Sequence, residues 1–287
     1  MKYAVIDVGS NSVRLMLWEK RTLYKKIACT RLAENMSGGF LDKASMERTA
    51  RAVRIFAEEG KKDGAGVIFV FGTAALRKAN NRDEFLTAVK EKCGLSVDVI
   101  SGEKEAEIGA LGALNGKDGG VIDVGGASTE IVVISGGKPV YEKSADVGAV
   151  TVKDACGDNE SKAFGLISDI ISIYGEIPKT EFTAIGGTAT SLSSVSLSLE
   201  TYDPEKVNGY VLTFSEVKRL KEKLYGMPLP ERLELKGLQR ERAGIIPSGA
   251  NILFTIMQKY GIERIRVSES DNLEGYIADK LKNEKEI

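Results

Sequence analysis

The pentapeptide Val-Ile-Asp-Val-Gly occurs twice in this chain, at residues 5–9 and again at residues 121–125. In both copies a serine stands three residues after the glycine. An internal repeat constrains the architecture strongly, because each copy must belong to a similar structural unit. Two copies separated by the length of a small domain indicate two related domains rather than a solenoid. We expect their turns to face each other across a cleft.

Each copy is typical of a buried strand that ends at an aspartate and a glycine-rich turn. Glycine lets the backbone N–H groups of a turn converge on a phosphate oxygen, and hydroxyl or amide side chains add donors. The predicted phosphate-binding residues are Gly9, Ser10, Asn11 and Ser12 in the first copy, and Gly125, Gly126, Ala127, Ser128 and Thr129 in the second. For either copy alone, a tight hairpin turn without a ligand is the alternative interpretation.

The order of predicted elements repeats with the pentapeptide. The first half contains strands at 2–8, 12–19 and 22–32, a helix at 44–62, a strand at 67–71, a loop at 72–77, a helix at 82–92, a strand at 95–100 and a helix at 101–114. The second half contains strands at 121–125, 130–135 and 138–146, a helix at 163–174, a strand at 182–185, helices at 215–225 and 248–260, a strand at 262–268 and a helix at 273–282. Glycines at 116–120 mark the boundary, so we predict an N-terminal domain at 1–118 and a C-terminal domain at 119–287.

The charge balance and the missing residue types exclude several classes of function. The chain has 40 Lys and Arg against 41 Asp and Glu, whereas a general nucleic-acid-binding protein is usually basic. It has no histidine, which excludes Ser-His-Asp catalysis and His-ligated zinc. No apolar run approaches the roughly 20 residues of a membrane span, Met1-Lys2 leads directly into a strand, and the three isolated cysteines are typical of reduced thiols. We therefore expect a cytoplasmic protein without nucleic-acid or membrane partners.

Three carboxylates stand where a magnesium ion would be held. Asp123 lies at the end of the repeated strand, Glu130 follows seven residues later across the turn, and Asp7 is the counterpart of Asp123 in the first copy. Mg²⁺ prefers oxygen ligands and bridges substrate phosphates, so the sequence predicts Mg²⁺ as the cofactor and these three residues as its ligands. The alternatives are an exposed strand position for Glu130 and a local bond to its own turn for Asp7.

Arg77 is a second type of candidate, because it follows a buried strand of the first half. A planar guanidinium can bind two phosphate oxygens and stabilise the charge that develops in the transition state. A surface salt bridge is the alternative role for this arginine.

Several short words of the sequence, taken in order, resemble one family. They are Asp7-Val-Gly-Ser-Asn-Ser12, Thr73-Ala-Ala-Leu-Arg77, Ser101-Gly-Glu-Lys-Glu105-Ala106, Asp123-Val-Gly-Gly-Ala-Ser-Thr-Glu130, Gly186-Gly-Thr188 and Glu241-Arg-Ala243. Together they resemble the exopolyphosphatase / guanosine pentaphosphate phosphohydrolase family in its short two-domain form. The resemblance implies an α/β fold of duplicated actin-like (ribonuclease H-like) βββαβαβα domains flanking an interdomain cleft.

The resemblance also implies a catalytic role for Glu105. In the family pattern, the glutamate before the small residue of Ser-Gly-x-x-Glu-Ala activates the attacking water, and Glu105 occupies that position here. Arg77 and Glu130 complete the predicted catalytic set. The alternative is that Glu103 and Glu105 only stabilise the positive end of a helix that Ser101 caps.

Three positions depart from the family pattern. Ala127 replaces a third glycine, so the backbone must avoid a positive φ there or bear strain. Gly244 replaces an aspartate, and residues 271–273 read Asp-Asn-Leu where the family has Gly-Leu-Arg, which removes one cation. Every proposed acidic residue is still present.

The leading functional hypothesis is a magnesium-dependent hydrolase that releases terminal orthophosphate from inorganic polyphosphate. Guanosine pentaphosphate is the alternative substrate, because the same turns fit both. A sensor that binds polyphosphate or a nucleotide without turnover is the non-enzymatic alternative. A kinase is less favoured because no catalytic aspartate can be assigned beside an acceptor pocket. The sequence does not fix the oligomeric state, and a homodimer stays open.

Overall fold

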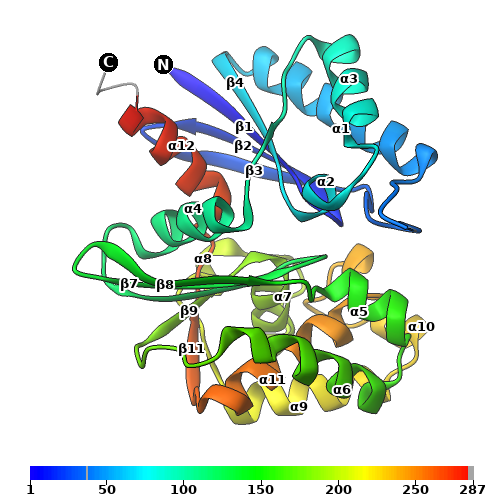
Figure 1. Cartoon of the computed structure of the whole chain (residues 1–287), viewed down its shortest axis with the longest axis vertical. Coiled ribbons are helices and arrows are strands. Elements are labelled where there is room, and N and C mark those ends of the chain that lie inside the picture. The colour runs from blue at the N-terminus through cyan, green and yellow to red at the C-terminus, as the bar shows by residue number, and fades with distance from the viewer. Residues whose placement is uncertain (37, 284–287) are drawn as a thin grey trace. The chain divides into compact units, whose positions relative to one another are not determined.

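The computed structural model describes residues 1–36 and 38–283. They form two compact units: the first contains the described residues of 1–105 and 272–283, and the second contains Ala106–Asp271. Each unit is an α/β structure built on one mixed sheet (Figure 1).

The first sheet has the strand order β3-β2-β1-β4-β5. Its strands are β1 (Lys2–Val8), β2 (Ser12–Glu19), β3 (Arg21–Cys29), β4 (Ala65–Gly72) and β5 (Asp98–Val99). β1 runs antiparallel to β2 and parallel to β4, and it lies at the centre of the sheet. Ala4, Val5 and Ile6 are all fully buried, which shows that β1 is covered on both faces.

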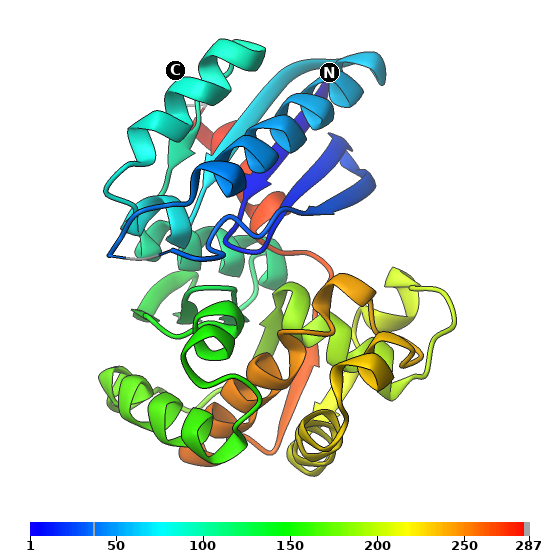
Figure 2. The same ribbon diagram turned by 90° about the vertical axis from the view of Figure 1, so that its right-hand side faces the viewer.

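Helices cover both faces of the first sheet. They are α1 (Lys43–Lys62), α2 (Ala74–Lys78), α3 (Arg82–Cys93) and α12 (Asn272–Asn283). Gly60 of α1 packs against Ala4, whereas Tyr276 of α12 stacks on Phe71 with ring centroids 4.4 Å apart. Phe71 is the β4 partner of Asp7, which points to the face opposite that of Ala4 because side chains alternate along a strand. Figure 2 shows α1 and α12 on opposite sides of this sheet, and Asp7 lies on the α12 face.

The second sheet has the order β10-β11-β9-β6-β7-β8. Its strands are β6 (Gly119–Val124), β7 (Thr129–Ser135), β8 (Lys138–Ala145), β9 (Phe182–Ile185), β10 (Val211–Thr213) and β11 (Arg264–Val267). With β6 as the counterpart of β1, the series β8-β7-β6-β9-β11 reproduces the first sheet, and β10 is added at the edge. The duplicated α/β topology that the sequence predicted is therefore confirmed.

The second sheet also has two differently covered faces. One face contributes Ile122 and Ile131 to a large core under several helices: α5 (Ala149–Cys156), α6 (Glu160–Ile170), α7 (Gly186–Ser196), α8 (Pro204–Val207), α9 (Phe214–Gly226), α10 (Leu229–Leu233) and α11 (Ile246–Tyr260). The other face contributes Val121 and Val132 to a small cluster with Ala110 of α4 (Gly102–Leu114). Figure 1 shows α4 on one side of this sheet and α6, α9 and α11 on the other.

Several predicted element bounds are wrong in the first unit. The strand predicted at 22–32 ends at Cys29, because the chain then turns back and donates Thr30 N–H to the Asn11 carbonyl at 3.0 Å. The loop predicted at 72–77 contains the short helix α2, and the strand predicted at 95–100 is reduced to Asp98–Val99. The predicted stop at Gly94 is confirmed, since this glycine has a φ of 74° at the end of α3.

The second unit needs similar corrections. The helix predicted at 163–174 begins at Glu160 and gives way to a 3₁₀ helix at Ile171–Tyr174, and the strand predicted at 262–268 shortens to β11. Helix α5, strand β10 and a second 3₁₀ helix at Arg240–Arg242 were not predicted. They arise from contacts with the rest of the unit rather than from a clear periodicity.

Within the described residues, no helix combines the length and the apolar character that crossing a membrane requires. Cys29, Cys93 and Cys156 are free thiols, as the sequence predicted.

Candidate active site

The first glycine turn joins β1 to β2 and is fixed from one side by backbone hydrogen bonds. Gly9 N–H donates to the Ser12 carbonyl at 3.0 Å, which closes the turn. The carbonyls of Ser10 and Asn11 accept hydrogen bonds from residues 30–33, which follow β3. A planar trans peptide points its N–H away from its C=O, so the N–H groups of these two peptides face away from that loop. This orientation is the one that the predicted anion-binding role needs.

Asp7, at the end of β1, forms an ion pair with an arginine of its own unit. The side chain of Asp7 is buried, and one of its oxygens accepts from Arg14 Nε at 2.9 Å and from Arg14 Nη2 at 2.6 Å. Arg14 stands directly opposite Asp7 in the register of β1 and β2. This ion pair is the kind of local bond that was the alternative for Asp7, and the metal-ligand role of Asp7 stays a prediction.

Glu105 and Arg77 form an ion pair inside the first unit. Arg77 Nη1, on α2, donates to Glu105 Oε2 at 2.7 Å and to the Ile100 carbonyl at 3.1 Å. Glu105 is 7% exposed. A neighbouring arginine favours the ionised form of a carboxylate, which is the form that a general base requires. The structure therefore brings together the two residues that the sequence singled out in this unit.

Glu103 and Glu105 both lie in the first turn of α4, but their side chains have different partners. Lys104 N–H donates to Ser101 Oγ at 3.1 Å, which caps the helix. Hydrogen bonds from its own backbone N–H and from the Ser101 hydroxyl lower the pKa of Glu103. Glu103 thus has the helix-stabilising role that was the alternative for both glutamates, whereas Glu105 is turned toward Arg77.

The second glycine turn joins β6 to β7 and has the same closing bond as the first. Gly125 N–H donates to the Ser128 carbonyl at 3.0 Å. The carbonyls of Gly125 and Gly126 accept from the first N–H groups of α5, at 2.9 Å and 2.8 Å. The N–H groups of Gly126 and Ala127 therefore face away from α5. Ala127 has no positive φ, so the missing third glycine causes no backbone strain.

Asp123 and Glu130 form an acidic pair beside this second turn. They stand opposite each other in the register of β6 and β7, and carboxylate oxygens of the two residues lie within 4.8 Å of each other. Asp123 is partly buried and Glu130 is 2% exposed. Two carboxylates so close repel each other unless a cation or a proton compensates them. The donor set, which consists of hard oxygen atoms at the end of a sheet, fits Mg²⁺.

The turn after β9 closes around Asp123. Gly186 has a φ of 78°, and a Cβ at this position would overlap Asp123 Oδ1. Thr188 donates from Oγ1 to the Val124 carbonyl at 3.0 Å, and the Arg242 guanidinium packs against Gly187. The Gly-Gly-Thr sequence thus lets α7 begin in direct contact with the Asp123 carboxylate.

Hydroxyl groups fix the backbone and side chains next to the acidic pair. Thr129, a predicted phosphate-binding residue, donates from Oγ1 to the Val147 carbonyl at 2.6 Å and is fully buried. Tyr174 donates to the Thr129 carbonyl at 2.6 Å, and burial raises the pKa of Tyr174 above its usual range. Ser144 of β8 donates to Glu130 Oε1 at 2.7 Å. The Thr129 hydroxyl therefore fixes the backbone beside the turn, and the Ser144 hydroxyl contacts the Glu130 carboxylate.

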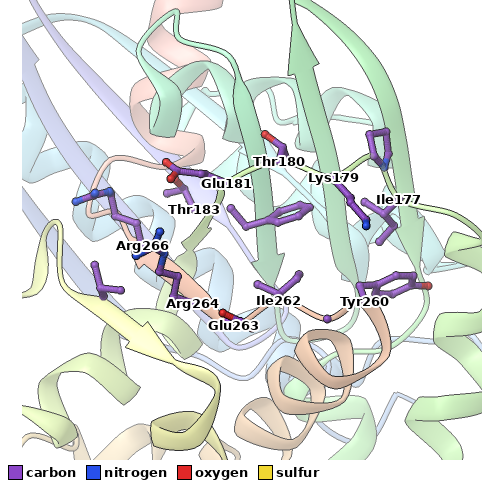
Figure 3. Close-up of a pocket in the computed structure, with 14 residues that line it drawn as sticks. Ile177, Lys179, Thr180, Glu181, Thr183, Tyr260, Ile262, Glu263, Arg264 and Arg266 are labelled. Carbon is purple, nitrogen blue, oxygen red and sulfur yellow. The ribbon is translucent and has the colours of Figure 1, made fainter.

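A separate pocket of about 560 Å³ lies in the second unit (Figure 3). Its lining includes Phe182 and Arg264, the first residues of β9 and β11, together with Lys179 and Arg266. The pocket is thus at the amino ends of these strands, whereas the Gly186 turn follows the carboxyl end of β9. None of the predicted site residues lines it, so it is distinct from the candidate active site.

Three residues of this site were missed by sequence reasoning. Arg14 follows Asp7 at the same interval at which Glu130 follows Asp123, so an alignment of the two repeats would have indicated it. Gly148 passes directly over the second turn, where a Cβ would overlap the backbone of Gly126. Ser144 and Gly148 carry no local signal, because their roles depend on strand register and on a crossing of the chain.

The duplicated sheets define an α/β protein with two related units. Residues 11–284 match the model of the "Ppx/GppA phosphatase family", and the chain belongs to this family. It is 31% identical to the guanosine-5'-triphosphate,3'-diphosphate pyrophosphatase of Photobacterium profundum, an alignment that covers 97% of this chain and 59% of that protein. The chain thus spans less than two thirds of that relative's length.

Solved structures agree on the fold. The Ppx/GppA enzyme of Aquifex aeolicus superposes with a TM-score of 0.79 at 27% identity, over 97% of this chain and 99% of that one. An exopolyphosphatase from Cytophaga hutchinsonii superposes with a TM-score of 0.88 at 21% identity, over 99% and 98%.

Proposed function

We propose that this protein is a magnesium-dependent hydrolase that releases terminal orthophosphate from inorganic polyphosphate. The observation that carries the proposal is the acidic pair Asp123–Glu130 beside a glycine turn whose N–H groups face away from the packed core. A phosphatase family is the context in which such a pair has a direct use, because phosphoryl transfer needs held phosphates and compensation of negative charge.

The protein residues divide the work of the proposed reaction. Backbone N–H groups of the turns at 9–12 and 125–129 bind phosphate oxygens. Glu105 takes the proton from the attacking water, and Arg77 holds the Glu105 carboxylate in place through a 2.7 Å hydrogen bond. Mg²⁺ held by Asp123 and Glu130 would supply charge neutralisation at the phosphates.

The ion pair with Arg77 affects the basicity of Glu105. A carboxylate paired with a guanidinium is a weaker base than a free one. The guanidinium also favours the ionised form of the carboxylate, which is the form that can accept a proton. The ion pair with Arg77 also fixes the direction of the carboxylate, which lowers the entropy cost of reaching a reactive geometry.

Orthophosphate release from long-chain polyphosphate in the presence of Mg²⁺ tests the proposal. The E105Q variant is expected to lose about a thousandfold in turnover, the usual scale for loss of a general base. E103Q is the matched control on the same helical turn, because Glu103 stabilises the helix start instead; its turnover is expected to stay close to wild type. Full activity in E105Q would reject the mechanism.

Guanosine pentaphosphate is the second candidate substrate. It is favoured by the similarity to a guanosine-5'-triphosphate,3'-diphosphate pyrophosphatase, a relative whose name specifies a guanosine substrate. Competition between polyphosphate and guanosine pentaphosphate in one reaction, followed by orthophosphate release, measures the preference. Tight binding of both ligands without any phosphate release would instead identify a sensor.

We also propose a cytoplasmic location, and a homodimer is the oligomeric hypothesis. Sedimentation of the purified protein measures the oligomeric state directly.

A further inference from the structure

Each sheet has a row of three adjacent residues that begins at the repeated aspartate, and the third residue of the row differs between the two units. In the second unit, β6, β7 and β8 place Asp123, Glu130 and Ser144 in one row across the sheet. In the first unit, β1, β2 and β3 place Asp7, Arg14 and Ile27 in the corresponding row. Directly opposed residues of neighbouring strands point to the same face, so each row is a set of adjacent side chains.

The chemistry of each row follows from its middle residue. Arg14 is compensated by Asp7 at 2.6 Å, and the third position of that row is the half-exposed apolar residue Ile27. Glu130 has a carboxylate for its neighbour instead, and the third position of its row is a hydroxyl. An ionised carboxylate only accepts hydrogen bonds, so Ser144 Oγ is the donor in its 2.7 Å contact with Glu130 Oε1.

We propose that Ser144 is a positioning residue for the metal site: its hydroxyl holds Oε1 of Glu130 and thereby orients the carboxylate toward the cation. This inference rests on the proposed function, because it assigns Glu130 as a metal ligand. Outer-shell hydrogen bonds of this kind fix the direction of a ligating carboxylate and typically change metal affinity by 10-fold to 100-fold when they are removed.

Ser144 and a neighbouring hydroxyl have different acceptors. The nearby Tyr174 hydroxyl donates to the Thr129 carbonyl, so this donor supports the backbone rather than the acid. Ser144 lies on the edge strand β8, which pairs with β7 alone, so its side chain can change without disturbing a second strand. Replacement of this serine therefore isolates the hydrogen bond.

Metal titration of the resting protein tests this inference without any substrate. Mn²⁺ serves as the spectroscopic probe for the divalent site, with binding measured by electron paramagnetic resonance and confirmed for Mg²⁺ by calorimetry. S144A is expected to weaken Mn²⁺ binding by about tenfold or more, whereas S144T, which keeps the hydroxyl, retains nearly wild-type affinity. S135A, on the exposed end of β7, is the matched control and leaves the affinity unchanged.

The split between binding and turnover gives a second readout. In S144A the concentration of Mg²⁺ that supports half-maximal phosphate release rises, while the rate at saturating Mg²⁺ stays within a few-fold of wild type, because the reacting groups are intact. Equal affinity in S144A and wild type would overturn the inference, and so would equal losses in S144A and S144T. Mn²⁺ binding that depends on Ser144 in a protein without phosphate release would overturn the proposed function alone. A wild-type protein that binds no Mn²⁺ would overturn the metal site and the role of Ser144 together.

Discussion

The two glycine turns, at residues 9–12 and 125–129, close with the same backbone hydrogen bond. They differ in the charge of the side chain opposite the preceding aspartate. Gly9 and Gly125 close their turns with N–H···O bonds of the same 3.0 Å length. The aspartate before each turn faces the residue seven positions later, which is Arg14 in the first unit and Glu130 in the second. The first hairpin pairs its aspartate with an arginine, whereas the second places two carboxylates opposite each other, an arrangement that fits the proposed cation.

This difference shows how a duplicated structure can divide its functions. The repeat preserves the part that backbone geometry dictates, namely a turn that presents N–H groups. A single position on the neighbouring strand places an arginine beside the aspartate in the first unit and a glutamate in the second, where we propose a metal site. Substitutions at this position and around it test whether it carries the functional difference.

The largest effect is expected from importing the arginine of the first hairpin into the second. E130R should form an ion pair with Asp123, since the register equals that of Asp7 and Arg14. Phosphate release should then fall by about a thousandfold or more, because the metal site is lost while the turn remains. Phosphate assays with circular dichroism measure the two properties separately. Activity within tenfold of wild type would show that Glu130 is not part of the metal site.

The next effect concerns the stability of the first hairpin. R14A leaves the buried Asp7 carboxylate without its arginine, and we expect a loss of about 3 kcal/mol in the free energy of unfolding. Chemical denaturation measures this loss. The exposed Arg21 of β3 provides the control, since R21A should change stability by less than about 0.5 kcal/mol. Similar stabilities of R14A and R21A would mean that the Asp7–Arg14 pair does not stabilise the fold.

A third prediction compares the glycines that follow the central parallel strands. Gly72 and Gly186 come directly after Phe71 and Ile185, the partners of Asp7 and Asp123. An added Cβ would meet the buried side chain of Leu76 at Gly72 and the Asp123 carboxylate at Gly186, and only Gly186 has a positive φ. G186A should therefore be about 2 kcal/mol less stable than G72A and should lower activity more strongly. Thermal denaturation and phosphate release measure both effects, and equal losses in the two variants would remove the distinction.

The smallest effect is the stabilisation that a bound metal provides. At a concentration tenfold above its dissociation constant, Mg²⁺ should raise the free energy of unfolding by about 1.4 kcal/mol, which chelation by EDTA should reverse. E130Q should abolish this increment, and R14Q should keep it, since Arg14 belongs to the compensated hairpin. An increment that disappears in R14Q and persists in E130Q would place the cation in the first unit.

Much of this architecture was predictable because it depends on short-range patterns. The repeated pentapeptide predicted β1 and β6, and the glycine-serine spacing predicted both turns. The parts that were not predictable depend on register and on long-range packing. The sequence placed Glu103 and Glu105 together at a helix start, but only the position of Arg77, on a separate helix, distinguishes their roles. Ser144 is an ordinary strand residue until the pairing of β7 with β8 places it opposite Glu130.

The return of α12 to the first unit has a consequence for how the protein is made. Tyr276 stacks on Phe71 and donates a hydrogen bond to Asp98 at 2.8 Å, so the first sheet receives one of its covers from a segment that is translated after the whole second unit. On the ribosome, the second unit can close its core while the first still has one sheet face bare. The unit whose synthesis begins first is therefore the unit whose sheet is covered last.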